Sequence, residues 1–418
     1  MDEEKLKNKV KHLLYSNIQQ GESMLLGKNY SFIAPSPYTY PFQFWWDTFF
    51  HVFILCNLDE YDLAKKNIES LFAQQDHDGF IGHMIFWKKI LPRNKSDILQ
   101  AKPTLKYIRP HMSSLIQPTL AAKAVERIYT DTGDKYFLYS MIPKLKKYYD
   151  WLEKNRDFDN DGLISIISPI ESGIDWKPSY DAVLNFKDGK ANWKLYWKVI
   201  AGVDGRNFLN RYDVEKIYKN DYFIVKDTLV NVLYSQDLKA FSRLLRTAGI
   251  DEYKKYHKRG VEVGKKIIKK MYDKKTGAFF DIYGKNDHQI RVLTFTTFLP
   301  LLLEETPNFI TKRLIEEHFR NKNEFSTPYP IPSTAANEPS FSTDETTYLW
   351  RGPTWVISNW LVFHCLRQKG YIDEAKILKD SVIKLIHKDG FREYYDPYTG
   401  KGMGAKNFTW SGLVLDMN

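Results

Sequence analysis

A recurring unit of two helical segments, closed by a glycine turn, is the feature that most constrains the fold of this chain. Apolar residues repeat at helical spacing in each segment, and a few extended residues follow each turn. Repeated units of this kind stack on one another and bury a shared core. The pattern predicts helix pairs at 45–56 with 61–72, 117–130 with 141–152, 238–248 with 263–271, and 355–367 with 375–386, with turns at Gly79, Gly162, Gly277 and Gly390.

The spacing of these units predicts an all-α fold. The two later intervals between turn glycines leave room for one further helix pair each, and residues 292–303 with 310–319 fit one of them. Six helical hairpins can close into an (α/α)6 barrel, with short β-hairpins and long loops at the active-site end. An open α-solenoid uses similar pairs at a shorter and steadier period, and it is the alternative. Residues 327–339 read as a long loop, so residues 1–418 are predicted to form one domain.

The composition limits the classes of partner. The net charge is +10, but the lysines are spread along helical stretches, and no basic block or basic–aromatic nucleic-acid motif occurs. We therefore expect a solvated basic surface and no nucleic-acid partner, with steering of an anionic substrate as the alternative.

Cysteine content and apolar runs bear on the compartment. Cys56 and Cys365 both lie inside apolar helical runs, which is typical of buried free thiols. No apolar segment of a secretion signal follows Met1, and the longest apolar run, 298–303, is too short to cross a bilayer. We expect a cytoplasmic protein without a membrane partner, whose oligomeric state the sequence leaves open.

The first of two notable carboxyl groups is Asp175. It lies in segment 171–178, where Gly173 and Pro178 exclude a continuous helix and predict a loop. Trp176 beside the carboxyl group would exclude water and raise its pKa, as a general acid that works near neutral pH requires. The alternative is a structural loop aspartate bonded to backbone amides.

The second carboxyl group is Glu393, in a short extended run after the turn at Gly390. Alternation along a strand places Phe391, Glu393 and Tyr395 on one face, and residues 396–400 turn the chain back. Such an acid is suited to be a general base, and a solvent-facing edge glutamate is the alternative. Hydrolysis of a glycosidic bond needs two carboxyl groups, one on each side of the bond, so we predict that both acids meet in one pocket.

Two other aromatic segments are candidates for the same pocket. Asp47 lies in the aromatic run 42–50, where a buried carboxylate needs hydrogen-bond partners such as sugar hydroxyls. A helix cap or a structural aspartate is the alternative. Trp350 and Trp355 flank a Gly-Pro turn and could frame a cleft, and Arg351 between them could hold a carboxylate of the protein or of a substrate.

A last acidic segment resembles half of a calcium-binding loop. Asp157, Asp159 and Asp161 have the spacing of an EF-hand, but Ser168 stands where its bidentate glutamate belongs. A structural Ca²⁺ completed by a distant acid is one interpretation, and an aspartate-rich turn is the other. No motif for a catalytic transition metal, a nucleotide or a nicotinamide occurs, so we expect that catalysis requires no cofactor.

Taken together, these segments resemble glycoside hydrolase family 63, and in particular its compact members that include mannosylglycerate and glucosylglycerate hydrolases. The matching segments follow the order of the family over nearly the whole chain, and only the set as a whole is specific. They are Trp46–Phe50, Gln117–Thr119, Glu171–Trp176, Trp350–Trp355 and Phe391–Pro397, followed by Phe408–Ser411.

The resemblance implies an (α/α)6 barrel and an inverting mechanism, with Asp175 as general acid and Glu393 as general base. It implies a sugar subsite in which Leu349 departs from the aromatic residue that relatives often carry. The residues that it implies around the substrate are Tyr40, Trp46, Asp47, Gln117, Trp350 and Trp355. The local sequence adds Trp176 and Arg351 as further candidates for binding substrate.

The sequence therefore predicts an inverting hydrolase of a short α-glucoside or α-mannoside, such as mannosylglycerate or glucosylglycerate. Its partner is expected to be a small carbohydrate. A sugar epimerase on an (α/α)-barrel and a non-catalytic helical scaffold are the alternatives.

Overall fold

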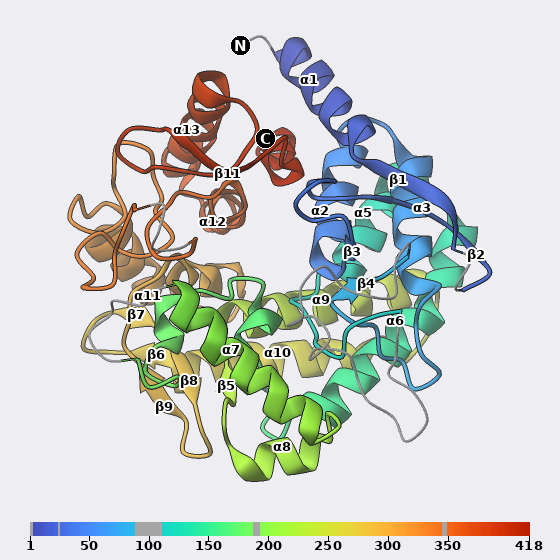
Figure 1. Ribbon diagram of the computed structural model, residues 1–418, viewed down its shortest axis with the longest axis horizontal. Coiled ribbons are helices and arrows are strands. Elements are labelled where there is room, and N and C mark those ends of the chain that lie inside the picture. The colour runs from blue at the N-terminus through green and yellow to red at the C-terminus, as the bar shows by residue number, and fades with distance from the viewer. Residues whose placement is uncertain (1–2, 24–25, 88–110, 187–192, 345–348) are drawn as a thin grey trace.

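The computed structural model describes residues 3–23, 26–87, 111–186, 193–344 and 349–418, and helices dominate it (Figure 1). The α-helices are α1 (Glu3–Ser16), α2 (Trp45–Cys56), α3 (Tyr61–Phe72), α5 (Ala121–Thr132), α6 (Lys135–Arg156), α7 (Trp193–Leu209), α8 (Val214–Asn220), α9 (Thr228–Thr247), α10 (Tyr253–Met271), α11 (Asn308–Arg313), α12 (Val356–Gln368) and α13 (Ile372–Asp389). The 3₁₀ helices are η1 (Pro169–Ser172), η2 (Pro178–Tyr180), η3 (Phe295–Leu302) and η5 (Thr409–Asp416), and η4 (Leu314–Phe319) is a π-helix.

The strands are short and pair only into small antiparallel sheets. Strands β1 to β4 are Ile18–Ser23, Lys28–Ile33, Gln43–Phe44 and Met84–Ile85; β5 to β8 are Val225–Lys226, Tyr272–Asp273, Ala278–Phe279 and Asp281–Tyr283; β9 to β11 are His288–Ile290, Arg392–Tyr395 and Gly402–Lys406. The described sheets are β1-β2, β3-β4, β5-β8-β9, β6-β7 and β10-β11. The prediction of a helix-rich chain with short β-hairpins is confirmed.

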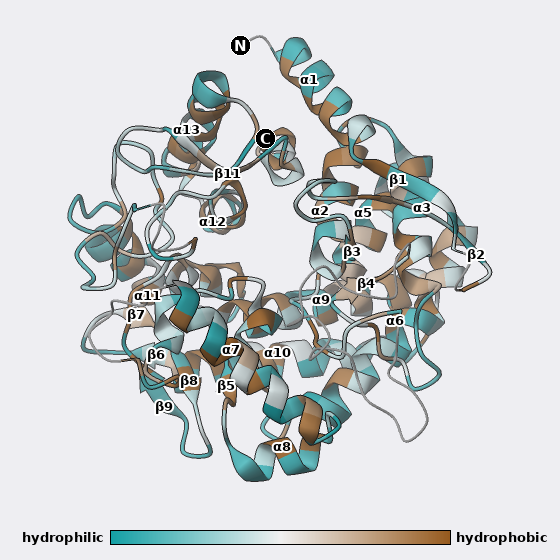
Figure 2. Cartoon of the chain, in the orientation of Figure 1, coloured by the Kyte–Doolittle hydropathy of each residue, from teal (hydrophilic) through white to brown (hydrophobic). Residues whose placement is uncertain are grey.

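All four predicted helix pairs are present, because α2 packs on α3, α5 on α6, α9 on α10 and α12 on α13. The two members of a pair differ in burial. Every residue of α2 is buried, whereas α10 buries only residues at helical spacing such as Tyr256, Val263, Ile267 and Met271. Helix α2 is thus covered on all sides, whereas α10 turns a polar face to solvent, and Figure 2 shows hydrophilic residues on the outer helices.

The first members of the pairs form a closed ring of contacts. Each element of the ring packs against the one that precedes it in the ring, and the final element, η5, packs against the first, α2. Figure 1 shows the chain passing around this ring from blue through green and yellow to red. The members are α2, α5, α9, η3, α12 and η5.

Two members of the ring differ from the sequence-based prediction. Residues 292–303 were expected to be α-helical, but η3 is a 3₁₀ helix that contains Pro300, which lacks the N–H that an α-helical bond needs. The sixth member is η5, and not a further helix pair between Gly162 and Gly277. The further helices of that interval, α7 and α8, are not members of the ring.

One hydrophobic core runs through the described residues from Leu6 to Met417. A small satellite cluster lies below the loops near Leu115 and Ile167. In the part of the chain that the structure describes, no helix is both long and apolar enough to span a membrane.

The hairpin topology decides where the candidate residues meet. Because each ring helix is followed by a returning helix, successive ring helices start at the same end of the molecule. Trp46 lies in the first turn of α2, Gln117 precedes α5, Asp227 caps α9 and Trp355 caps α12. These residues therefore gather around one end of the ring.

Candidate active site

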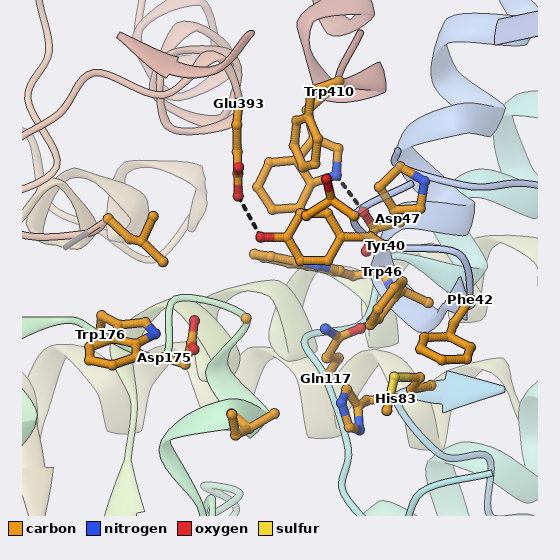
Figure 3. Close-up of a pocket in the computed structure, with 18 of the residues that line it drawn as sticks. Tyr40, Phe42, Trp46, Asp47, His83, Gln117, Asp175, Trp176, Glu393 and Trp410 are labelled. Carbon is orange, nitrogen blue, oxygen red and sulfur yellow. Dashed lines mark hydrogen bonds between the residues drawn. The ribbon is translucent and has the colours of Figure 1, made fainter. Parts of the chain in front are cut away.

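Asp175 and Glu393 line the same cavity of about 270 Å³ (Figure 3). Asp175 comes from the loop between η1 and η2, and Glu393 comes from β10. Figure 3 shows the two carboxyl groups on different sides of the pocket, with the Tyr40 hydroxyl bonded to Glu393. Two acids that are far apart in the sequence therefore face a common space.

The loop that carries Asp175 is packed tightly against α2. Gly173 ends η1 with a φ of +70°, a conformation that glycine adopts without strain. A Cβ atom at this position would lie 2.4 Å from the ring of Trp46. The glycine that signalled a loop in the sequence thus also lets an aromatic wall of the cavity approach the backbone.

Burial governs the ionisation of Asp175. Asp175 is partly buried in the cavity wall, and this burial raises the pKa of its carboxyl group to about 7, helped by the negative charge of Glu393. A hydrogen bond from the Trp176 side chain acts in the opposite direction. The Asp175 carbonyl oxygen also accepts a bond of 3.1 Å from the Tyr196 hydroxyl on α7. At neutral pH a large share of the molecules therefore carries a proton at this position.

Glu393 is held by a hydrogen bond at each carboxylate oxygen. The Tyr40 hydroxyl donates to Oε1 at 2.8 Å, and the Ala405 backbone N–H donates to Oε2 at 2.8 Å. Burial raises the pKa of Glu393, and these two donors oppose that rise. Both donors favour the ionised form, so the two acids of the cavity have different surroundings.

The strand that carries Glu393 does not keep the predicted alternation. Its register with β11 shifts between Arg392 and Tyr394, and Glu393, Tyr394 and Tyr395 are all buried. Phe391, which was expected to share a face with Glu393, does not line the cavity. The extra residue lies on β11, because two steps along β10 from Arg392 to Tyr394 correspond to three along β11 from Lys406 to Met403.

Asp47 is a third carboxyl group of the cavity. It lies inside the first turn of α2, whose N-cap is Phe44, so it is not a helix cap. The Trp410 indole N–H donates to its Oδ1 at 2.5 Å. Burial raises the pKa of Asp47 to about 7, and the bond from Trp410 opposes this rise.

Aromatic rings form most of the remaining wall. Trp350 and Trp355 are stacked, with ring centroids 3.9 Å apart and planes 9° apart, and both line the cavity. Leu349 also lines it at a φ of +39°, and its carbonyl oxygen accepts a bond of 2.5 Å from the Trp355 indole. Gln117 contributes a polar group, and its Oε1 accepts the Trp46 backbone N–H at 3.2 Å.

The structure brings together all but one of the residues predicted around the substrate. The exception is Arg351, which does not line the cavity and whose side chain is 1% exposed. Its Nη1 donates to Asp181 at 2.8 Å, its Nη2 contacts the other carboxylate oxygen, and its guanidinium lies over the Tyr196 ring. This geometry does not support substrate binding by Arg351, because a protein carboxylate, the other partner that the sequence left open, occupies its hydrogen-bonding edge. The residues that do line the cavity are Tyr40, Trp46, Asp47, Gln117, Trp176, Trp350 and Trp355.

Several lining residues were not predicted. Trp410 and Phe408 belong to a matching segment, but nothing local indicated that they reach Asp47 and Tyr40. His83 has a buried neutral ring, because burial lowers its pKa to about 3 and its Nδ1 lies 2.6 Å from the Ser113 hydroxyl. The other lining residues are Pro35, Thr39, Phe42, Phe44, Met84, Ile170, Gly173, Trp197 and Leu349.

The acidic segment with EF-hand spacing forms a different structure. Asp157 accepts the backbone N–H groups of Asp161 and Gly162 at 2.9 Å, as in an aspartate-rich turn. Asp159 and Asp161 pair with Lys226, and Asp161 also contacts Lys270. Among the residues that the structure describes, no group of three or more His, Cys, Asp or Glu side chains could hold a metal ion. The geometry thus gives the calcium prediction no support, because ammonium groups neutralise these carboxylates.

A helix-rich fold whose cavity holds two opposed carboxyl groups among tryptophan rings is the arrangement of a glycoside hydrolase. Comparison with known proteins identifies the family. The model of the mannosylglycerate hydrolase MGH1-like glycoside hydrolase domain matches residues 40–411, and the chain belongs to this family, as a compact member of glycoside hydrolase family 63. It is therefore a glycoside hydrolase, and the epimerase and scaffold alternatives are set aside.

Individual relatives agree with this assignment. The mannosylglycerate hydrolase of Thermus thermophilus is 28% identical, over 92% of this chain and 95% of its own. The glucosylglycerate hydrolase of Mycolicibacterium hassiacum is 25% identical, over 91% and 92%. A crystal structure of the family 63 mannosylglycerate hydrolase from Thermus thermophilus in complex with Tris has a TM-score of 0.85 and 26% identity, over 99% of both chains.

Proposed function

We propose that this enzyme hydrolyses a short α-mannoside or α-glucoside, such as mannosylglycerate or glucosylglycerate, with inversion at the anomeric carbon. The observation that carries the proposal is the meeting of Asp175 and Glu393 in one aromatic-walled cavity. The substrate class comes from relatives named mannosylglycerate and glucosylglycerate hydrolases, which the chain matches along nearly its full length.

Asp175 is the proposed general acid. A pKa of about 7, raised mainly by burial, leaves it protonated often enough near neutral pH to donate to the departing glycosidic oxygen. Because the carboxyl group lines the cavity, it can deliver this proton to a substrate bound there.

Glu393 is the proposed general base. Its two donors, the Tyr40 hydroxyl and the Ala405 N–H, favour the ionised carboxylate that must take a proton from water. In an inverting reaction this water attacks the face of the sugar opposite to the leaving group. The two carboxyl groups must therefore stand farther apart than in a retaining enzyme, where one of them attacks the sugar directly.

The sugar is expected to rest among the tryptophan rings and the polar groups of Asp47 and Gln117. Indole faces match the flat C–H patches of a pyranose, and the carboxyl and amide groups can accept or donate to its hydroxyls.

The closed ring of α2, α5, α9, η3, α12 and η5 supports an (α/α)6 barrel, and the continuous core supports one catalytic domain over residues 1–418. We propose that the reaction uses no cofactor and that the partner is a small carbohydrate. A cytoplasmic location remains a prediction.

The test is to incubate the enzyme with α-mannosylglycerate and α-glucosylglycerate and to follow the first anomer released by proton NMR. We expect the β-anomer to appear before mutarotation, together with glycerate. Initial release of the α-anomer would overturn inversion, and no release from either compound or from simple α-glucosides and α-mannosides would overturn the proposed substrate class.

A further inference from the structure

Two residues after Asp175, the chain buries a lysine among carboxylates. The Lys177 side chain is 1% exposed, and its ammonium group contacts Asp227 and lies 2.6 Å from Asp281. Burial alone would lower the pKa of this lysine, but the two carboxylates outweigh it and raise the pKa. Lys177 does not line the cavity, so it is charged and yet separated from the substrate.

The two carboxylates are themselves fixed to the body of the molecule. Asp227 is the N-cap of α9, and its Oδ1 accepts the Val230 N–H at 3.0 Å. Asp281 lies on β8, and its Oδ1 accepts the Thr228 N–H at 2.8 Å. Lys177 is therefore anchored to the start of a buried ring helix and to a neighbouring strand.

The same cluster holds the chain that follows Lys177. The Tyr180 hydroxyl donates to Asp227 at 2.7 Å, and the Ser179 hydroxyl donates to Asp281 at 2.7 Å. On the other side, the Lys177 backbone N–H donates to Ile174 at 2.9 Å and closes a turn around Asp175. The residue that enters the charged cluster thus also closes the turn that presents the acid.

We propose that Lys177, with Asp227 and Asp281, is the positioning residue of the general acid. The ion cluster fixes the backbone on one side of Asp175 and so sets the direction of its carboxyl group. A general acid must lie within hydrogen-bond reach of the leaving oxygen, and an error of about 1 Å in such a group lowers rates by about 10²-fold. This inference rests on the proposed function of Asp175.

The test compares two substrates that differ in their need for an acid. A glycosyl fluoride releases fluoride without protonation by an acid, whereas the glycosidic oxygen of a glycerate or alkyl glycoside must be protonated as it departs. The probes are the α-mannosyl or α-glucosyl fluoride that the wild type hydrolyses and the glycerate glycoside of the same sugar. We expect Lys177→Met to lower the rate on the glycoside by about 10²-fold and the rate on the fluoride by less than about 5-fold.

The ratio of the two rates, measured on one preparation, does not depend on how much of the variant is folded. Asp281→Asn provides a second variant, in which Lys177 keeps Asp227, and we expect the same direction with a smaller change in the ratio. Lys177→Arg restores a cation and is expected to recover part of the loss on the glycoside.

The control is Lys239→Met. Lys239 is a buried lysine on α9 whose ammonium group lies 2.7 Å from Glu305, and neither residue lines the cavity. This variant should leave the ratio unchanged. An equal fall on both substrates in Lys177→Met and Asp281→Asn, or no fall on either, would overturn the positioning role. Failure of the wild type to hydrolyse any of these compounds would instead overturn the proposed function.

Discussion

The two sides of the cavity are built by different physical means. The segment around Asp175 is fastened by buried ion pairs: Lys177 with two aspartates, Arg351 with Asp181, and Arg156 with Glu171 at 2.5 Å. The segment around Glu393 belongs to a two-stranded hairpin, and neutral donors hold its carboxylate.

This difference matches the two tasks that we propose. A carboxyl group that must stay protonated needs a dry site, and fully paired charges can hold a loop in place without leaving an unpaired charge near it. A carboxylate that must stay ionised needs donors, and a hairpin supplies a backbone N–H while Tyr40 supplies a hydroxyl. The geometry of the acid is thus expected to depend on charge pairs, and the strength of the base on hydrogen bonds.

The largest expected effect separates the two carboxyl groups by substrate. Glu393→Ala should lower kcat by about 10³-fold on both a glycoside and a glycosyl fluoride, because attack by water is needed in both reactions. Asp175→Ala should cause a similar loss on the glycoside but spare the fluoride. Initial rates with both compounds check this, and a fluoride that depends equally on Asp175 would contradict the assignment of the acid.

The next effect concerns stability on the acid side. Arg351→Met leaves Asp181 buried without its partner and should lower the free energy of unfolding by about 3–5 kcal/mol. Urea denaturation followed by circular dichroism measures this. Lys376→Met is the matched control, since its pair with Asp380 is exposed and should contribute less than about 1 kcal/mol. Equal losses in the two variants would contradict the importance of buried charge pairs.

On the base side, removal of one donor should change acidity more than stability. Tyr40→Phe removes a bond that lowers the pKa of Glu393, so this pKa should rise further above its ordinary value. The base works when ionised, so kcat/KM should fall by about 10-fold at low pH, and less as the pH rises above the pKa of Glu393. An unshifted acidic limb in the pH profile of kcat/KM would show that this hydroxyl does not tune the base.

The smallest effect links the two sides. Asp175 acts when protonated and its pKa is about 7, so the activity should decline as the pH rises through about 7. Glu393→Gln removes the negative charge that helps to raise this pKa, and the pKa of Asp175 should then decrease. Carbon-13 NMR titration of labelled aspartate in both proteins measures the shift. An unchanged pKa would mean that the charge of Glu393 does not affect the ionisation of Asp175.

Much of the fold could be predicted because helical spacing is a local signal. The bounds of α2 and α3 coincide with the prediction, since an apolar run and an amphipathic run are each continuous. The nature of η3 and the use of η5 to close the ring depend on contacts between distant segments. Short 3₁₀ elements leave no such signal.

The site was predicted where glycine, proline and tryptophan mark a loop, as around Asp175. The partner of Arg351 stayed open because a sequence shows an arginine's capacity for carboxylates, but not which carboxylate it meets. His83 and Trp197 went unnoticed, because a single aromatic side chain carries no sign of the cavity that it will line.

The closure of the ring by η5 has a consequence for biosynthesis. Asp416 in this element binds Asn57 and Arg127 at 2.8 and 2.9 Å, and Trp410 holds Asp47, so the earliest ring helices obtain partners from a segment that lies 289 to 363 residues later in the chain. A nascent chain on the ribosome must keep the apolar flank of α2 uncovered until residues 409–416 have left the exit tunnel. The cavity wall that Phe408 and Trp410 supply is therefore complete only after this segment has been translated, and a chain that stalls before it leaves that flank of α2 uncovered.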